Sequence, residues 1–319
     1  MRLFSLIALF AAALLFSGCI QLPSSGGAKG TVPPKAGTAP GADSAADGIS
    51  AETGEGASGE AAAEDAAPSE PAGPQEPTGP AEQPDGPETA QVPATSLENR
   101  EISYASGAWK IYGTLYDSKS KAPTKAVMLI PALGKTRDSY PVGFIESLHE
   151  RLPDAVVIAI DLRGHGKSTN LGTYESFDMA AFKDMKSDII NARAFVQKEY
   201  PNVKEYYLVG ASMGSTAAIL AGAQEKAYTK LVMLSPGMEY RGVSIERAAE
   251  DYQFDIFAAA SKDDAEGYSA SSANTIRSLH SGTTEVKIYS GTAHGTDMFA
   301  ATEGSDAPLS GAILEFLLK

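Results

Sequence analysis

Residues 205–224, EYYLVGASMGSTAAILAGAQ, place Ser212 between a predicted buried strand and a predicted helix. Glu205–Val209 is aromatic and branched apolar, as expected of a strand buried on both faces. Met213–Gln224 is a run of small and apolar residues that favours a helix. The pentapeptide Gly210–Gly214 joins the two as G-x-S-x-G, and a sharp strand–turn–helix gives its two glycines a physical role. The start of the helix also favours negative charge that develops beside the serine.

The sequence around this segment alternates between predicted strands and helices. Glu101–Ala105 and Trp109–Tyr116 read as a β-hairpin that turns at Ser106-Gly107. The other predicted strands are Lys125–Ile130, Ala155–Ile160, Lys230–Leu234, Asp255–Ala260 and Glu285–Tyr289. The other predicted helices are Ser139–Leu152, Phe177–Glu199, one around Ser272–Leu279, and Leu309–Leu318. Such alternation predicts an α/β fold with a mostly parallel central sheet and helices on both faces.

Charge is distributed unevenly along the 319 residues. The formal net charge is −14, yet no Lys or Arg occurs between Lys35 and Arg100, and thirteen Asp and Glu residues lie in that interval. The remaining residues therefore sum to −1. A domain over residues 95–319 would be nearly neutral, which gives no indication of a nucleic-acid partner.

The N-terminus has the pattern of an export signal. Met1-Arg2 precedes an apolar run, Leu3–Phe16, which is too short to span a bilayer comfortably. The run ends in Phe16-Ser17-Gly18-Cys19, which resembles the lipobox of bacterial lipoproteins, with Phe where Leu is commoner. The resemblance implies cleavage before Cys19, the only cysteine, and lipid attachment to it. An ordinary secretory signal with an incidental cysteine is the alternative.

A linker is predicted between the signal and the domain. Pro23–Pro93 is dominated by Ala, Gly, Pro, Glu, Ser and Thr and contains no aromatic residue, so it lacks the apolar area needed to offset its ordering entropy. We expect a signal peptide at 1–18, a lipid-anchored disordered tether at 19–94 and a folded domain at 95–319. An acidic interaction tail is the other interpretation of the linker. The expected location is the cell envelope: the outer membrane in a double-membraned source, because Ile20 is not Asp, and otherwise the cell surface.

The folded region as a whole resembles the α/β-hydrolase superfamily. Besides the pentapeptide, Asp161–Ser168 reads DLRGHGKS and looks like that family's D-x-R-G-x-G-x-S turn. In the family this turn is structural, so Asp161 and His165 are expected to be scaffold. His149 and His280, in or beside helices, are interpreted as surface residues. The segment Ser235–Phe254 is too short for a cap domain, which implies an open site like that of compact esterases and dienelactone-hydrolase-like proteins.

The resemblance also implies a catalytic triad in the order Ser, acid, His. His294 follows the predicted strand Glu285–Tyr289 on a glycine-flanked loop and fits the base. The acid is expected after Asp255–Ala260, where aligning Ser261–Ala265 with the family's G-x-x-D-P favours Asp264, and a frame shift of one favours Asp263. The oxyanion hole is expected from the backbone N–H groups of Leu133 and Met213, although many relatives have His-Gly where this chain has Pro131-Ala132.

The activity implied by the resemblance is hydrolysis of a carboxylic ester or related acyl bond through an acyl-enzyme formed at Ser212. Neither a metal nor an organic cofactor is implied, and the expected partners are a small-molecule acyl substrate and a membrane bound through the lipid. Thioesterase, peptidase and haloperoxidase activities remain open on the same scaffold. A non-catalytic surface-binding module with this fold remains open too.

Overall fold

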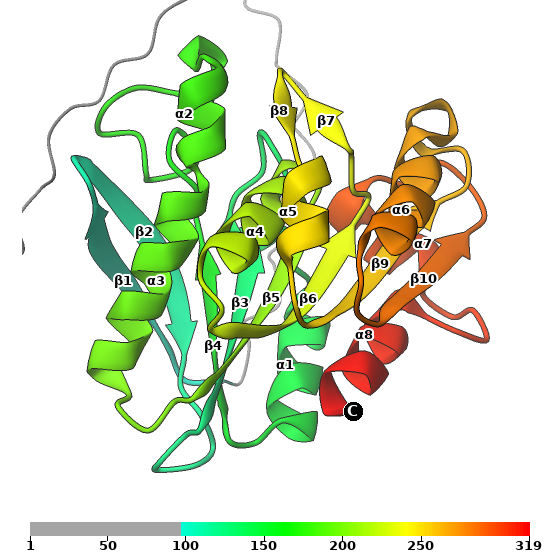
Figure 1. The fold of residues 1–319 in the computed structure, drawn as a ribbon. Helices are drawn as coiled ribbons and strands as arrows, with labels where there is room; N and C mark the ends of the chain where they lie inside the picture. Colours follow the sequence, from blue (N-terminus) through cyan, green and yellow to red (C-terminus); the bar gives the residue numbers. More distant parts are fainter. Residues whose placement is uncertain (1–96) are drawn as a thin grey trace, which may run out of the picture. The chain divides into compact units, whose positions relative to one another are not determined.

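The predicted sheet is present in the computed structural model, which describes residues 97–319 (Figure 1). Eight strands form it: β1 (Asn99–Ser106), β2 (Trp109–Tyr116), β3 (Lys125–Ile130), β4 (Ala155–Ile160), β5 (Glu205–Ala211), β6 (Tyr228–Leu234), β9 (Asp255–Ser261) and β10 (Thr284–Tyr289). The predicted signal peptide, Cys19 and the acidic linker lie outside the described residues.

The strands follow the order β1-β2-β4-β3-β5-β6-β9-β10 across the sheet. The hairpin β1–β2 is antiparallel, and β2 also pairs antiparallel with β4. Every pair from β4 to β10 is parallel. The carboxyl ends of six parallel strands therefore lie along one edge, where the loops that follow them can bring distant side chains together.

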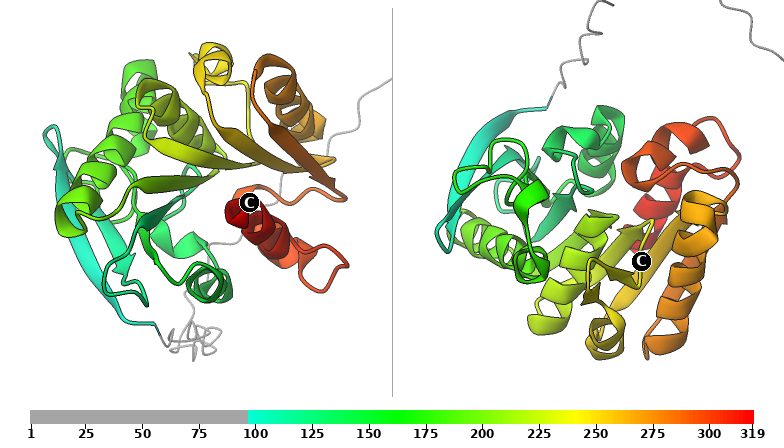
Figure 2. Two further views of the ribbon diagram at one scale, coloured as in Figure 1. Left: turned by 60° about the horizontal axis from the view of Figure 1, so that its bottom comes forward. Right: turned by 90° about the horizontal axis from the view of Figure 1, so that it is seen from above.

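Helices cover both faces of the sheet (Figure 2). One layer holds α3 (Lys186–Glu199), α4 (Met213–Gln224), α5 (Glu246–Asp251) and α6 (Tyr268–Leu279), and the other holds α1 (Val142–Arg151), α7 (Met298–Thr302) and α8 (Leu309–Leu318). Successive residues of a strand point to opposite faces of the sheet. Met128 packs with the core on the side of α3, α4, α5 and α6, and Val127 and Leu129 pack with the core on the side of α1, α7 and α8. This alternation explains the continuous apolar runs that predicted the central strands.

The predicted helix over residues 177–199 is interrupted, so its continuity was predicted wrongly. The carboxylate of Asp178 accepts a hydrogen bond from the Ala181 N–H at 2.8 Å and starts α2 (Met179–Asp184), and α3 begins at Lys186. At the junction the Met185 N–H donates to the carbonyl of Phe182 (3.2 Å), three residues back. This tighter turn replaces the α-helical spacing of four.

The segment between β6 and β9 contains a short helix and a small hairpin. Within residues 235–254 the structure places α5 and a small antiparallel hairpin, β7 (Glu239–Tyr240) with β8 (Val243–Ser244). The segment is still too short for a cap domain, as predicted. In Figure 1 the hairpin stands near α2 at one end of the molecule.

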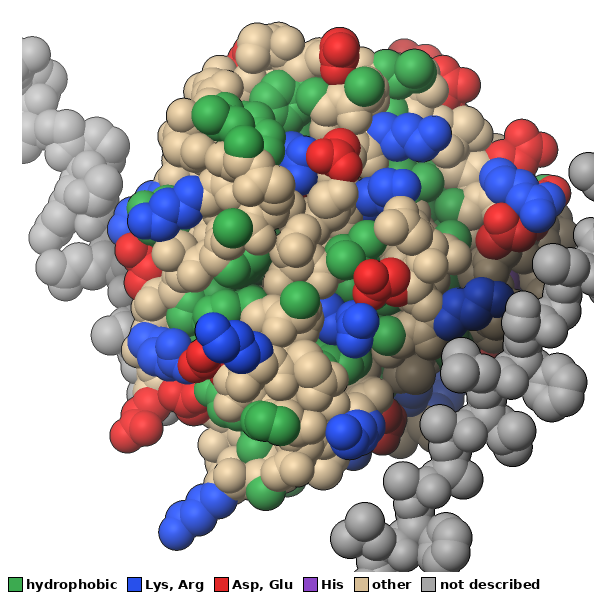
Figure 3. All heavy atoms as spheres, turned by 60° about the vertical axis from the view of Figure 1, so that its left-hand side comes forward, with side chains coloured by type: hydrophobic (Ala, Val, Ile, Leu, Met, Phe, Trp, Pro, Cys, Tyr) green, Lys and Arg blue, Asp and Glu red, His purple; other side chains and the backbone are tan. Residues whose placement is uncertain are grey.

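The surface of the described residues carries both signs of charge. Figure 3 shows acidic and basic side chains interspersed over one face. Residues 95–319 hold 23 Lys and Arg and 28 Asp and Glu residues, a formal net charge of −5, so the domain is more acidic than the near-neutral expectation, because Arg2, Lys29 and Lys35 lie in the rest of the chain. None of the helices within residues 97–319 has the length and apolar character needed to cross a membrane.

Two histidines expected at the surface are buried, which corrects the sequence interpretation. His149 is 1% exposed and His280 is 6% exposed. The ring of His149 packs edge-on against Tyr116, and within residues 97–319 neither of its nitrogens has a hydrogen-bond partner. His280 Nδ1 lies 2.7 Å from the hydroxyl of Thr284. Burial lowers the pKa of both histidines.

We predict that His149→Leu stabilises the protein. A buried polar group without a partner costs about 1–3 kcal/mol, and leucine removes it at similar volume. The gain should grow below about pH 6.5, because the unfolded chain then binds a proton that the buried ring of lowered pKa resists, and the wild type loses stability there. Urea unfolding at pH 7, 6 and 5 measures both effects.

The comparison variant is His280→Leu, which also removes one buried nitrogen without a partner among the described residues, Nε2, but gives up the contact between Nδ1 and Thr284. Its gain at pH 7 should therefore be smaller than that of His149→Leu. A His149→Leu protein less stable than wild type at every pH would contradict the prediction.

Candidate active site

Ser212 sits on a strained turn between β5 and α4. Its φ is 50° and its ψ −118°, in a region that non-glycine residues seldom occupy. The flanking glycines permit the turn, because a Cβ on Gly210 would lie 2.6 Å from the Gly214 carbonyl oxygen. A Cβ on Gly214 would lie 2.5 Å from the Ile130 carbonyl oxygen and closer still to that of Pro131. The predicted strand–turn–helix is therefore present with both glycines at points of close backbone approach.

The close approach at Gly214 brings the serine turn against the loop after β3, which carries Leu133. Leu133 and Met213 both line the same pocket as Ser212. Within the described part of the chain, neither backbone N–H donates a hydrogen bond. Free N–H groups on residues that share a pocket with a serine are what an oxyanion hole requires of its donors.

His294 and Asp264 meet, as the predicted triad requires. His294 Nδ1 lies 2.9 Å from both carboxylate oxygens of Asp264. The Asp264 side chain is 5% exposed and the His294 side chain 45%. A buried carboxylate on one ring nitrogen fixes which nitrogen carries the proton and leaves the other for a reacting group.

Asp263, the competing candidate acid, is exposed, and its backbone N–H donates to the carbonyl of Gly291 at 3.0 Å. No hydrogen bond or ion pair joins its carboxylate to another described residue. The geometry therefore favours Asp264. Ser212 and His294 line one pocket, but no hydrogen bond between their side chains exists within residues 97–319. Such contacts commonly tighten only when substrate binds.

Two buried serines that the sequence interpretation missed hold the histidine loop from both sides. Ser261 Oγ donates to the carbonyl of Ala293 at 2.8 Å, and Ser235 Oγ accepts from the N–H of Gly295 at 2.9 Å. These groups flank His294 along the chain. Ser261 stands where the family's acid motif has glycine, and this departure was the available sequence signal. Ser235 directly follows β6 with φ 48°, and no sequence signal marked it.

The pocket has a volume of about 360 Å³. Its walls come from the loops that follow β3, β5, β6, β9 and β10 and from the hairpin β7–β8. The lining residues are Ala132, Leu133, Lys135, Ser212, Met213, Thr216, Ser235, Gly237, Glu239, Tyr240, Ala265, Tyr268, Ser269, His294, Thr296 and Asp297. Lys135 and Asp297 form an ion pair of 3.6 Å within this lining.

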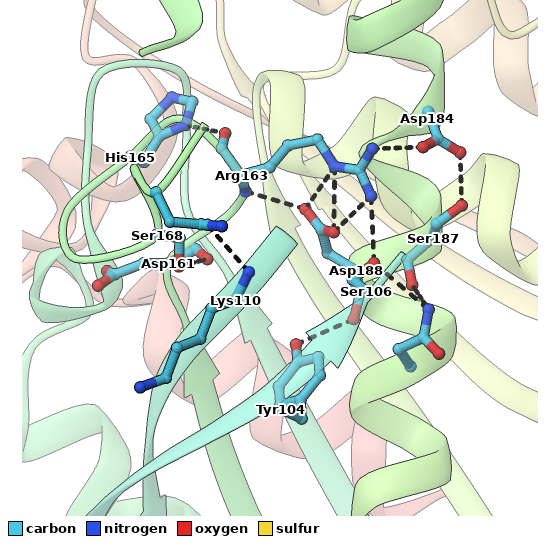
Figure 4. A network of polar contacts seen from close by, with 12 residues as sticks. Tyr104, Ser106, Lys110, Asp161, Arg163, His165, Ser168, Asp184, Ser187 and Asp188 are labelled. Atoms are coloured by element: carbon cyan, nitrogen blue, oxygen red, sulfur yellow. Dashed lines mark hydrogen bonds and ion pairs between the residues drawn. The ribbon is translucent and has the colours of Figure 1, made fainter. Parts of the chain in front are cut away.

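The Asp161–Ser168 turn holds neighbouring elements together away from the pocket (Figure 4). The Asp161 carboxylate accepts hydrogen bonds from the backbone N–H groups of Arg137 (2.9 Å) and Lys167 (3.1 Å). Arg163 Nη2 lies 2.7 Å from Asp188 of α3, and the guanidinium also contacts Asp184 of α2. Burial raises the pKa of Asp188 despite these contacts. This network agrees with a scaffold role for the turn.

His165, in the same turn, is buried and contacts other parts of the scaffold. Its Nδ1 lies 2.9 Å from the carbonyl of Arg163, and its ring stacks on Tyr174 with 4.5 Å between centroids. Burial lowers the pKa of His165.

Within residues 97–319, no cluster of three or more His, Cys, Asp or Glu side chains could hold a metal ion.

Comparisons with known proteins bear on the fold. A family model described as serine aminopeptidase, S33, matches residues 121–249. A thermostable carboxyl esterase from Bacillus coagulans superimposes with a TM-score of 0.56 at 16% identity, covering 70% of this chain and 98% of the esterase. The fold is that of the α/β-hydrolase superfamily.

Two further solved structures are similar at low identity. Est1E from Butyrivibrio proteoclasticus, solved with ferulic acid, gives a TM-score of 0.56 at 18% identity and covers 68% of this chain and 98% of its own. Dienelactone hydrolase from Anabaena variabilis gives 0.50 at 14% and covers 70% and 95%. No curated protein sequence matches the chain.

We predict that Gly214→Ala strongly destabilises the α/β-hydrolase domain. Its methyl group would meet the carbonyl oxygens of Ile130 and Pro131, and backbone atoms cannot swing aside as side chains do. The free energy of unfolding in urea should fall by about 3 kcal/mol or more. Gly143→Ala, in α1 with open space around its Cβ position, is the control and should be neutral or stabilising by about 0.5–1 kcal/mol. Equal effects of the two substitutions would contradict the close approach.

Proposed function

We propose that residues 95–319 form a serine hydrolase that cleaves carboxylic esters through an acyl-enzyme, with Ser212 as nucleophile, His294 as general base and Asp264 as its orienting acid. The observation that carries this proposal is the contact of His294 Nδ1 with the buried Asp264 carboxylate, in a histidine that shares its pocket with Ser212. The fold shared with solved esterases supports the same reaction class.

In the proposed reaction, Ser212 Oγ attacks the ester carbonyl carbon as His294 Nε2 accepts the hydroxyl proton. Asp264 keeps the Nδ1 proton in place and stabilises the imidazolium that forms. The N–H groups of Leu133 and Met213 would donate to the oxyanion, and their freedom from other hydrogen bonds supports this role. His294 then protonates the departing alcohol, and water activated by the same histidine releases the acid.

Peptide hydrolysis is the second candidate, because the family model that matches residues 121–249 is described as serine aminopeptidase. The same residues would act, with an amine in place of the alcohol as leaving group. Parallel assays on an activated ester and on an aminoacyl amide separate the two candidates.

We predict that Asp264→Asn lowers kcat on an activated ester by about three to four orders of magnitude, because the wrong histidine tautomer is then favoured. Asp263→Asn is the matched control, since its exposed carboxylate contacts no histidine, and it should change kcat less than threefold. Ser212→Ala supplies the baseline and should abolish turnover with the fold intact. A larger loss of kcat in Asp263→Asn than in Asp264→Asn would assign the role of the acid to Asp263. Turnover by Ser212→Ala within tenfold of wild type would refute the nucleophile.

We further propose that the enzyme is exported and anchored to the cell envelope by lipid on Cys19. The support is in the sequence: an apolar run of signal-peptide length ends at Ser17-Gly18-Cys19, and about 75 residues then precede the domain. One acyl chain holds a protein only marginally, whereas two or more make a stable anchor. A flexible linker of that length spans about 40–50 Å, which would let the domain reach substrates beyond the bilayer.

We predict that the mature protein begins at Cys19 and that Cys19 carries lipid. Mass spectrometry of the N-terminal peptide from the native host is the direct measurement. Cys19→Ser should leave an unprocessed precursor or mis-sorted protein, while Ser17→Ala, which keeps a small residue, should still be processed. An unmodified Cys19, or a mature start at another residue, would remove the anchor.

A further inference from the structure

Three hydroxyl groups that line the pocket have no hydrogen-bond partner among residues 97–319. Thr216, Ser269 and Thr296 are 2%, 2% and 5% exposed, and all three line the pocket. Among the hydrogen bonds of residues 97–319, none involves their side-chain oxygens. None of the three oxygens is fully shielded from solvent, so each retains some accessible surface. Because the residues are almost wholly buried, that surface opens into the pocket.

The three hydroxyls come from separate elements. Thr216 lies one turn into α4 beyond Ser212, Ser269 lies in the first turn of α6, and Thr296 follows His294. Each hydroxyl can donate to or accept from a ligand, and a ligand that covers it without making that hydrogen bond leaves it unpaired at a cost. A ligand with one polar group satisfies one such site, whereas several hydroxyls on one ligand can satisfy groups on several walls.

The rest of the lining suits a neutral, polyhydroxylated ligand. Tyr240 and Tyr268 are 39% and 45% exposed and offer aromatic surface for the C–H faces of such a molecule. The Glu239 carboxylate has no partner among the described residues and can accept from hydroxyl groups, while Tyr268 Oη holds the Glu239 backbone N–H at 2.9 Å. Lys135 is already paired with Asp297, which leaves the lining without a free cation for an anionic substrate.

From these groups we infer that the substrate is an acyl ester of a polyhydroxylated alcohol, a glycerol or a sugar, and that Thr216 and Ser269 hydrogen-bond its free hydroxyls. Apolar surface beside Ser212, from Ala132, Leu133 and Met213, accommodates a short acyl group. This inference rests on the proposed serine esterase activity and specifies its substrate class.

The test compares pairs of acetate esters of which only one member carries hydroxyl groups. Glyceryl 1-monoacetate is paired with 2-methylbutyl acetate, in which methyl groups replace the two hydroxyls. Glucose 6-acetate is paired with tetrahydropyran-2-ylmethyl acetate, in which hydrogen replaces the four ring hydroxyls, so that each pair keeps the same acyl group and the same alcohol skeleton. The wild-type kcat/KM should favour the hydroxylated member of at least one pair by tenfold or more, since a site built for hydrogen bonds rejects analogues that lack them. The pair with the larger ratio identifies glycerol or sugar as the source.

Variants then assign the preference to the two side chains. Thr216→Val and Ser269→Ala should each reduce the ratio by about threefold to tenfold, the loss of one hydrogen bond. Thr229→Val is the matched control, because it removes another unpartnered buried hydroxyl, on β6 outside the pocket lining, and it should leave the ratio unchanged. Thermal unfolding of each variant checks that it is folded.

The outcomes separate this inference from the proposed function. Hydrolysis of all four esters with ratios below tenfold, or ratios that Thr216→Val and Ser269→Ala leave unchanged, would overturn the polyol inference and keep the esterase. Failure of the folded wild type to hydrolyse any of the four esters, with activity on an aminoacyl amide or none at all, would overturn the esterase proposal and this inference with it.

Discussion

The site depends on the close backbone approach at Gly214. The peptide groups of Ile130 and Pro131 lie where a side chain at Gly214 would stand, so the serine turn is pressed against the loop that follows β3. That contact places Met213 and Leu133 in one pocket and holds Ser212 at a positive φ. Strain of this kind persists only where the surrounding structure determines it, here β5, α4 and the neighbouring loop. The proposed nucleophile and the proposed oxyanion donors are thus parts of one rigid junction.

The positions of the proposed acid and base depend on the edge of the parallel sheet. Asp264 and His294 follow the neighbouring strands β9 and β10, which pair in parallel, so their side chains emerge side by side. Ser235 directly follows β6 and Ser261 ends β9, and their hydroxyls bind the peptide groups on both sides of His294. Two hydrogen bonds to a loop restrict its conformations, which gives the proposed base on an exposed loop a defined position.

Sequence patterns predicted the framework well because burial imposes regular periods. β2, β3, β4, α4 and α8 have the bounds that their apolar runs predicted. The break at Met185 was not predictable from the sequence, because residues 179–199 contain neither Gly nor Pro to mark it. Arg163, from a distant turn, contacts Asp184 and Asp188 on the two sides of the break. His149 was misjudged because its burial against Tyr116 is a tertiary contact between α1 and β2.

The pocket was less predictable than the framework. Serine and threonine are common at strand ends and in helices, so nothing in the sequence separates Thr216 or Ser269 from any other hydroxyl residue. These two hydroxyls are informative because they line one cavity and have no hydrogen-bond partner among the described residues, and only the folded structure shows this. The hairpin β7–β8 escaped prediction because each of its strands has two residues, too few to show a period.

The central claim is that Ser212 is a nucleophile activated by His294. A fluorophosphonate probe reacts with serine hydroxyls that have such a base, and mass spectrometry locates the adduct within the chain. The account predicts one adduct, on Ser212, that forms in wild type and is lost when His294 is replaced by alanine in a folded protein. An adduct on another residue, or no labelling of the folded wild-type protein, would contradict it.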